Sequence, residues 1–178
     1  MSNVDALDTP AMALPSVEEA ALPRRQYLTF MLAGEEYALD ILWVQEIRGW
    51  CRATRVPNSA EFMCGVINLR GAIIPIIDLR LRFGLPQQAY SSTTVVVVLR
   101  VCAEGKERIM GVVVDAMAET YNIPDNAILP SPQVGGVMDP EFVQGLVTVE
   151  DKMVVVLDVD ALLSTPELAL DSATENDN

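Results

Sequence analysis

Apolar residues in this chain are grouped into short runs that come in pairs, and each pair is separated by a few turn-forming residues. The clearest pair is GVINLRGAIIPIIDLR, residues 65–80, whose two runs meet at Arg70-Gly71. Residues 26–41, 93–117 and 145–159 share this design, with polar or glycine-containing turns. Such paired runs are typical of β-hairpins. The pattern predicts four hairpins and an all-β fold with short helices, built as barrels or a sandwich.

The hairpins also fall into two matched sets. When Gly65 is aligned with Gly145, the apolar positions of residues 65–80 coincide with the apolar positions of residues 145–160. Similarly, YALDILWVQEI (37–47) matches MGVVVDAMAET (110–120) in its pattern. A pattern that recurs within one chain predicts two similar small β-units.

Each matched set contains an aspartate directly after a strand-like run, Asp78 in one and Asp158 in the other. The segments that follow, LRLRFG and VDALLS, are long enough for one helical turn. An aspartate before such a turn accepts hydrogen bonds from its free N–H groups, so both are predicted to be structural N-caps. Gly84 suits the end of the first helix. The alternative, a catalytic carboxylate pair, lacks a neighbouring acid, base or metal ligand.

Three of the runs do not alternate between apolar and polar residues: 72–77 (AIIPII), 95–99 (VVVVL) and 153–157 (MVVVL). A strand of a sheet with one face in water would alternate. These strands are therefore predicted to be apolar on both faces, either between two β-units or partly covered by another protein. Pro75 cannot donate a ladder hydrogen bond, which predicts an edge strand or a bulge at this position.

Charge and composition narrow the classes of function. The formal net charge is −13, which argues against nucleic-acid binding because phosphate contacts need clustered cations. There is no histidine, so the commonest general base and metal ligand is missing. The chain is nevertheless locally basic between residues 48 and 82, which indicates either an ordinary solvated face or a site for an acidic partner. The arginines of this segment are Arg48, Arg52, Arg55, Arg70, Arg80 and Arg82.

The sequence gives no sign of a metal, a cofactor or a membrane span. Its cysteines, Cys51, Cys64 and Cys102, lack CxxC spacing and are odd in number. The apolar runs are shorter than the ~18 residues that a membrane-spanning helix needs, so we expect a cytoplasmic protein. Residues 1–24 and 165–178 are acidic and are expected to be flexible tails around one domain, residues 25–164.

The Arg70-Gly71 turn has a physical interpretation of its own. Gly71 can adopt the positive φ that a tight turn requires, and Asn68 is placed to support the turn. Arg70 would then project a planar guanidinium, which suits two-point binding of a carboxylate. A solvated turn arginine is the structural alternative.

The segments YALDILWVQEI, GVINLRGAIIPIIDLRLRFGL, TTVVVVL, GVVVDAM and DKMVVVLDVDALL together resemble the CheW family of bacterial chemotaxis adaptors, from about Gln26 to Ser164. The resemblance implies two five-stranded Src-homology-like β-barrel subdomains that form one CheW-like domain. It implies no enzymatic activity and no cofactor. The implied partners are the cytoplasmic tips of chemoreceptors (methyl-accepting chemotaxis proteins) and the regulatory domain of the histidine kinase CheA. The implied location is cytoplasmic, at membrane-associated receptor arrays.

Carried over by motif, the receptor-facing surface includes Val44 and Glu46 of VQEI, Gly65 at the strand entry, and Arg70 and Gly71 of NLRG. We hypothesise that Glu46 and Arg70 lie close enough to pair and to order each other. The kinase-facing residues stay unassigned, with loops of the second β-unit as the expected contributors. One alternative is the CheW-like regulatory part of a CheA-type kinase or of a receiver-linked adaptor in a non-flagellar pathway. An enzyme would need a nucleophile and a base in one pocket, for which no motif is present.

Overall fold

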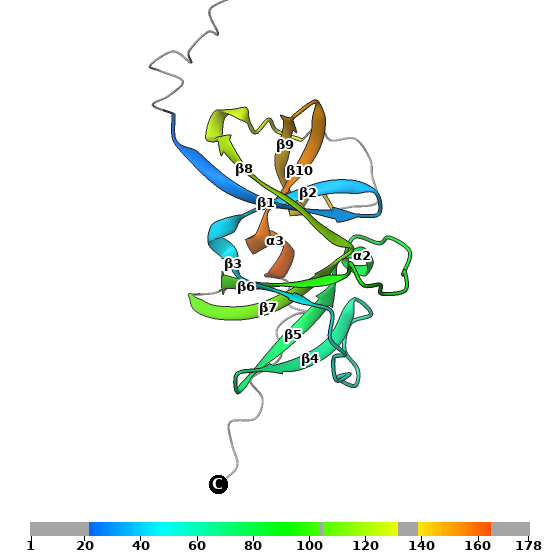
Figure 1. Cartoon of the computed structure of the whole chain (residues 1–178). Coiled ribbons are helices and arrows are strands. Elements are labelled where there is room, and N and C mark those ends of the chain that lie inside the picture. The colour runs from blue at the N-terminus through cyan, green and yellow to red at the C-terminus, as the bar shows by residue number, and fades with distance from the viewer. Residues whose placement is uncertain (1–21, 104, 132–138, 165–178) are drawn as a thin grey trace, which may run out of the picture.

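The computed structural model describes residues 22–103, 105–131 and 139–164 (Figure 1). Two five-stranded sheets, connected by short helical turns, account for most of this part of the chain, which confirms the predicted fold class. Both expected tails lie largely or wholly outside the described residues, and the first strand already begins at Arg24. No helix in the described ranges is long and apolar enough to cross a membrane.

The first sheet, at the top of Figure 1, is called the upper barrel. Its strands run in the order β8-β1-β2-β10-β9. Their bounds are β8 Ala116–Pro124, β1 Arg24–Leu32, β2 Glu35–Asp40, β10 Lys152–Leu157 and β9 Val143–Val149. Neighbouring strands are antiparallel, apart from the parallel pair β2 and β10.

The second sheet, below it, is called the lower barrel and has the order β3-β6-β7-β5-β4. Its strands are β3 Val44–Gly49, β6 Val95–Ala103, β7 Lys106–Val114, β5 Ala72–Asp78 and β4 Met63–Leu69. Here the parallel pair is β5 and β7. The short helices are η1 Ile41–Trp43, α2 Leu79–Arg82, η2 Asp125–Ala127, η3 Pro140–Phe142 and α3 Val159–Leu163.

All four predicted hairpins are present, and the two sheets have equivalent strand orders, which confirms two similar β-units. The units are interleaved along the chain. The first and last hairpins, β1–β2 and β9–β10, belong to the upper barrel, whereas β4–β5 and β6–β7 belong to the lower one. The chain crosses between barrels after β2, to form β3, and again after β7, to form β8. Each barrel therefore takes its fifth strand from the continuation of a hairpin of the other.

The uninterrupted valine run of β6 is buried on both faces, as its sequence predicts. Val96 and Val98 point into the lower barrel, where they pack with Ile74 and Ile76. The alternate residues, such as Leu99, belong to a separate core that also contains residues of the upper barrel and of α3. A strand that separates two apolar cores has no face for polar side chains, because each face removes apolar surface from water.

Pro75 does not lie in an edge strand, which was one of the two positions that its chemistry predicted. Its strand, β5, is an interior strand between β7 and β4, and Pro75 is paired with Val66 of β4. The parallel ladder to β7 begins only at Ile76. The β4–β5 pairing also shifts register next to this pair, between Met63 and Gly65. The edge-strand alternative is therefore wrong, whereas the alternative of a bulge agrees with the register shift one position away.

Candidate functional site

The tip of the β4–β5 hairpin is a tight turn in which two consecutive residues have positive φ. These are Arg70, with φ of 49°, and Gly71, with φ of 88°. The Gly71 N–H donates a hydrogen bond to Asn68 Oδ1 at 2.9 Å, as the sequence predicted. Two left-handed residues give a turn whose twist matches that of the flanking strands. The left-handed conformation of Arg70 was not foreseen, because arginine has no special preference for it.

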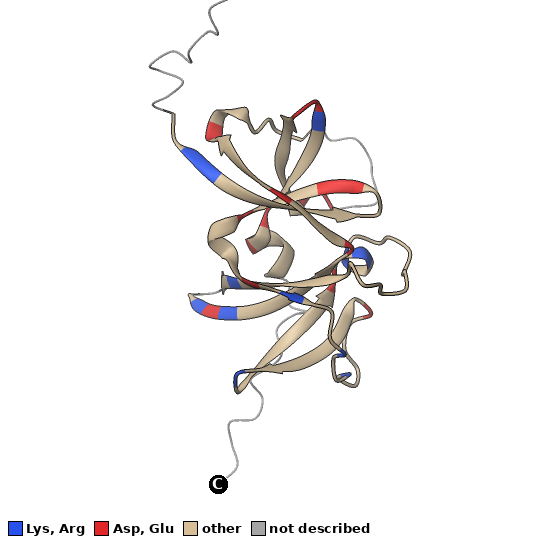
Figure 2. Ribbon diagram, viewed as in Figure 1, with Lys and Arg blue, Asp and Glu red and all other residues tan. Residues whose placement is uncertain are grey.

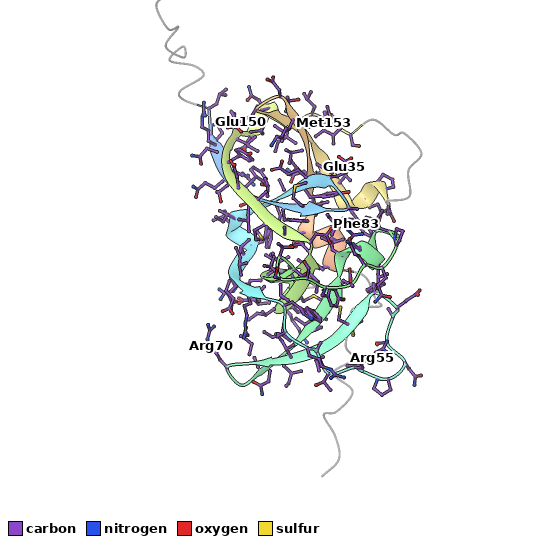
Figure 3. The ribbon with its side chains drawn as sticks, turned by 45° about the vertical axis from the view of Figure 1, so that its right-hand side comes forward. Glu35, Arg55, Arg70, Phe83, Glu150 and Met153 are labelled. Atoms are coloured by element: carbon purple, nitrogen blue, oxygen red, sulfur yellow. The ribbon has the colours of Figure 1, made fainter. Side chains whose placement is uncertain are left out.

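Arg70 and Glu46 form an ion pair, although Arg70 lies in the β4–β5 turn and Glu46 lies in β3, at the other end of the strand order. Arg70 Nη1 donates to Glu46 Oε2 at 2.8 Å, and Arg70 lies at the hairpin tip in Figure 3. The Arg70 side chain is 74% exposed and that of Glu46 is 20% exposed. Arg48 Nε lies 3.8 Å from the other carboxylate oxygen of Glu46. Glu46 is therefore held between two guanidinium groups, and the exposed Arg70 is held in one direction.

Edge strand β3 supplies the other side of this surface. Val44, at its start, is half-buried and packs against the core between the barrels. The pairing of β3 with β6 shifts register between Val44 and Glu46, which changes the direction of the strand at this point. Two large apolar side chains here are exposed to solvent. Ile47, which follows Glu46 in β3, is 44% exposed, and Leu42 of η1 is 82% exposed. The sequence did not predict this exposure, because an apolar pattern alone does not specify which positions of β3 and η1 face water.

Gly65 is buried and acts through the backbone. Thr54 and Val66 exchange two backbone hydrogen bonds of 2.8 Å, which connect the segment after β3 to β4. A Cβ atom at Gly65 would lie 2.1 Å from the Thr54 carbonyl oxygen, and Gly65 has φ of 139°. Only glycine permits this close approach. Gly65 therefore closes the lower barrel and brings β3 toward the hairpin that carries Arg70, without offering a side chain to a partner.

The matched glycine of the upper barrel has the same role. Leu129 and Leu146 form the equivalent two-way backbone bridge. A Cβ atom at Gly145 would lie 2.4 Å from the Leu129 carbonyl oxygen. The alignment of Gly65 with Gly145 thus corresponds to a shared closure of the two barrels.

The aspartates Asp78 and Asp158 lie at helix N-caps. Asp78 Oδ1 accepts from the Arg80 N–H at 2.9 Å, and Asp158 Oδ1 accepts from the Ala161 N–H at 3.0 Å. Asp78 also accepts from the Tyr90 hydroxyl at 2.8 Å. Burial raises the pKa of the Tyr90 hydroxyl, and hydrogen bonds to Cys64 and Asp78 add to the effect. Both aspartates are therefore structural caps, and Asp78 also binds the half-buried Tyr90 hydroxyl.

Burial also raises the pKa of the Cys64 thiol, which lies 3.4 Å from the Tyr90 hydroxyl. A thiol with a raised pKa is mostly protonated at neutral pH and is a poor nucleophile. Within residues 22–103, 105–131 and 139–164, no group of three or more Cys, Asp or Glu side chains could hold a metal ion.

A charged cluster connects the two barrels near the start of α2. Arg80 donates from Nε and Nη2 to the two carboxylate oxygens of Asp115, at 2.7 and 2.5 Å. Asp115 also accepts from the backbone N–H of Ala33, in the β1–β2 turn, at 2.9 Å. The hydrogen bonds from Arg80 lower the pKa of the Asp115 carboxyl. Asp115 thus joins an arginine of the lower barrel to a turn of the upper barrel.

Comparison with known proteins gives consistent matches over both barrels. A family model described as "CheW-like domain" matches residues 26–167. Chemotaxis protein CheW of Klebsiella aerogenes is 40% identical over 146 residues, which cover 82% of this chain and 86% of that protein. Probable chemotaxis protein CheW of Rhizobium etli is 34% identical over 143 residues, 80% of this chain and 90% of that one. The crystal structure of scaffolding protein TtCheW from Thermoanaerobacter tengcongensis matches with a TM-score of 0.72 and 34% identity, over 82% of this chain and 91% of that one.

Proposed function

The chain belongs to the CheW family, and from this premise we propose that it is a chemotaxis adaptor that couples chemoreceptors to the histidine kinase CheA. In this role it binds the cytoplasmic tips of receptors with one surface and the regulatory domain of CheA with another. Its place is the cytoplasmic side of the receptor array, which it reaches through its partners. The relatives named above as chemotaxis proteins, and the scaffolding protein of matching fold, support this role.

The observation that carries the receptor-binding part is the Glu46–Arg70 pair. Arg70 is largely exposed, yet its guanidinium is held by Glu46 at 2.8 Å beside an edge strand with an exposed isoleucine, Ile47. An ordered guanidinium keeps further N–H donors for a partner carboxylate or carbonyl, and the nearby apolar surface adds burial. Val44 and Gly71 complete the proposed contact surface, and Gly65 supports it by closing the barrel.

The function is tested by co-sedimentation with receptor-containing membranes, with and without CheA. We expect the unaltered chain to sediment with the membranes and to bring CheA with it. Arg70→Glu reverses the charge at the tip and places two carboxylates together, so we expect receptor binding to fall on the order of tenfold or more. Lys152→Glu, at the tip of the matched β9–β10 hairpin, is the control and should bind receptor normally.

The possible outcomes test the adaptor role and the proposed contact surface around Arg70 separately. If the chain binds neither receptor membranes nor CheA, the adaptor role is wrong. If the chain and Arg70→Glu bind receptor equally well, the role stands but the contact surface lies elsewhere. Binding to CheA alone would mean that the receptors in the assay belong to another pathway.

A further inference from the structure

A groove of about 610 Å³ lies on the lower barrel, away from the hairpin tip that carries Arg70. Its lining includes Trp50, Arg52, Arg55, Met63, Leu81 and Tyr90. Figure 3 labels Arg55 and Arg70 on opposite sides of this barrel, and Figure 2 shows basic positions in the loop between β3 and β4. We call this feature the arginine groove.

The floor of the arginine groove is aromatic and its rim is cationic. Trp50 and Tyr90 are in ring contact, with centroids 4.1 Å apart. Arg52 and Arg55 are exposed, and neither forms an ion pair with any residue that the structure describes. Among the described residues that line the groove, Glu61 is the only acid. The groove therefore combines apolar surface with cations that have no carboxylate partner in this part of the chain.

We propose that the arginine groove binds the acid-rich C-terminal segment of the same chain, residues 165–178. This segment contains four acids, Glu167, Asp171, Glu175 and Asp177, and no base. It also contains two leucines, Leu168 and Leu170, whose side chains suit the aromatic floor. Opposite charges and matching apolar parts are the features that make two surfaces complementary. This inference does not depend on the proposed function.

The last described element, α3, contacts a residue that adjoins the groove lining in the sequence. Helix α3 ends at Leu163, and the Leu162 carbonyl accepts from Arg82 Nη2 at 3.4 Å. Arg82 follows Leu81, which lines the groove, and its guanidinium lies 4.7 Å from the centre of the Phe62 ring. Phe62 in turn precedes Met63, another lining residue. The end of α3 therefore contacts Arg82, whose neighbour in the chain, Leu81, lines the groove.

Because the segment and the groove belong to the same chain, even a low intrinsic affinity would keep the groove partly occupied. Attachment to the same chain gives a short segment an effective concentration on the order of millimolar. An intrinsic affinity of only about 1 mM would then leave the groove occupied in roughly half of the molecules. Two exposed arginines on an aromatic floor are adequate for an interaction of that strength.

The test uses the two tryptophans of the chain, Trp43 and Trp50, as reporters. Trp50 lines the groove, whereas Trp43 packs against the core between the barrels and serves as an internal reference. We compare the indole N–H signals, by NMR, of the unaltered chain with those of a variant in which the four tail acids are replaced by amides. We expect the Trp50 signal to shift and the Trp43 signal to stay. Dilution should not change the shift, because the contact is intramolecular.

The same comparison is then made in two further backgrounds. In Arg52→Glu with Arg55→Glu, neutralising the tail should no longer move the Trp50 signal. In the control, Lys106→Glu with Lys152→Glu, the shift should persist, because these lysines lie outside the groove. An identical Trp50 signal in the native and neutralised chains would overturn the proposal, as would a shift that survives reversal of Arg52 and Arg55. A shift that disappears on dilution would overturn it in favour of the tail of a second copy.

Discussion

At the residue scale, the charged side chains of this protein have two different kinds of role. The pair of Arg70 with Glu46 lies mostly in water, so its energy is small and its effect is to fix a direction. The cluster of Arg80, Asp115 and the Ala33 N–H is less exposed and connects two parts of the fold. Removal of a charge should therefore affect binding at the first site and stability at the second.

For the exposed pair, we expect a double-mutant cycle with Glu46→Gln and Arg70→Ala to give a coupling energy of only about 0.5 kcal/mol in the free energy of unfolding. The reason is solvent screening of Arg70, which is 74% exposed. Urea unfolding of the four proteins measures the coupling. A value of about 2 kcal/mol or more would mean that the pair is part of the folded core rather than a device of the surface.

For the cluster between barrels, Asp115→Asn should lower the free energy of unfolding by about 2 kcal/mol at pH 7, because charged hydrogen bonds are lost. The pKa of Asp115 is lowered in the folded state by Arg80. Its contribution is thus fully present above the unfolded pKa of about 3.9 and is lost as the pH falls through the lower folded pKa.

The unaltered chain and Asp115→Asn should therefore become more similar in stability as the pH is lowered from 7 toward 3. Urea unfolding at several pH values measures this difference. Asp125→Asn is the control, since Asp125 pairs with Arg25 in an exposed position and should have little effect at any pH. A difference for Asp115→Asn that does not change with pH would argue against the ion pair as its cause.

At the element scale, the glycines have two different roles. Some allow two backbone segments to approach each other closely, and others adopt the positive φ of a turn. Gly65 and Gly145 let a neighbouring backbone approach to a distance that no Cβ atom permits, and so allow each barrel to close. Gly71 has open space around it, and its requirement is the positive φ of the turn alone. Gly65 and Gly71, although they lie in the same sequence motif, therefore contribute to the fold in different ways.

Replacement of each glycine by alanine should separate these roles. Gly65→Ala should destabilise the protein by about 3 kcal/mol or more, because the new methyl group meets the Thr54 backbone and not a movable side chain. Gly71→Ala should cost only about 1 kcal/mol, the cost of a left-handed alanine. Denaturant unfolding gives both values. Equal losses for the two variants would disprove the role of Gly65 in closure.

At the scale of the whole molecule, the two barrels share one core and each contains a strand that continues from a hairpin of the other. Phe83, at the end of α2, is 2% exposed and lies between the barrels in Figure 3. Its ring lies 5.6 Å from that of Tyr37 in β2 and 6.2 Å from that of Phe142 in η3. The interleaved strands and this shared aromatic cluster should make the molecule unfold as one unit.

Phe83→Ala should cost about 3–5 kcal/mol, because a large buried ring is removed. Native-state hydrogen exchange should show an equal loss of protection in the β1–β2 hairpin of the upper barrel and the β6–β7 hairpin of the lower one. Leu42→Ala, at a side chain that is 82% exposed, should change neither measurement appreciably. Loss of protection in one barrel alone would mean that the barrels unfold independently.

The sequence by itself determined the features that depend on near neighbours along the chain. Hairpins follow from runs of strand-forming residues around turn residues, and the helix caps follow from aspartates directly before helical turns. The motif around Arg70 also pointed to the hairpin tip, because the turn and its Asn68 support lie within four residues of one another.

Only the tertiary structure decided how these pieces combine. The exchange of β3 and β8 between barrels, the interior position of Pro75 and the contact of Glu46 with Arg70 all depend on pairings between strands that are distant in sequence. Hydrophobic periodicity shows that a strand face will be buried, but it does not specify which strand covers it. The same limit applies to Gly65, whose role depends on a backbone that arrives from another segment.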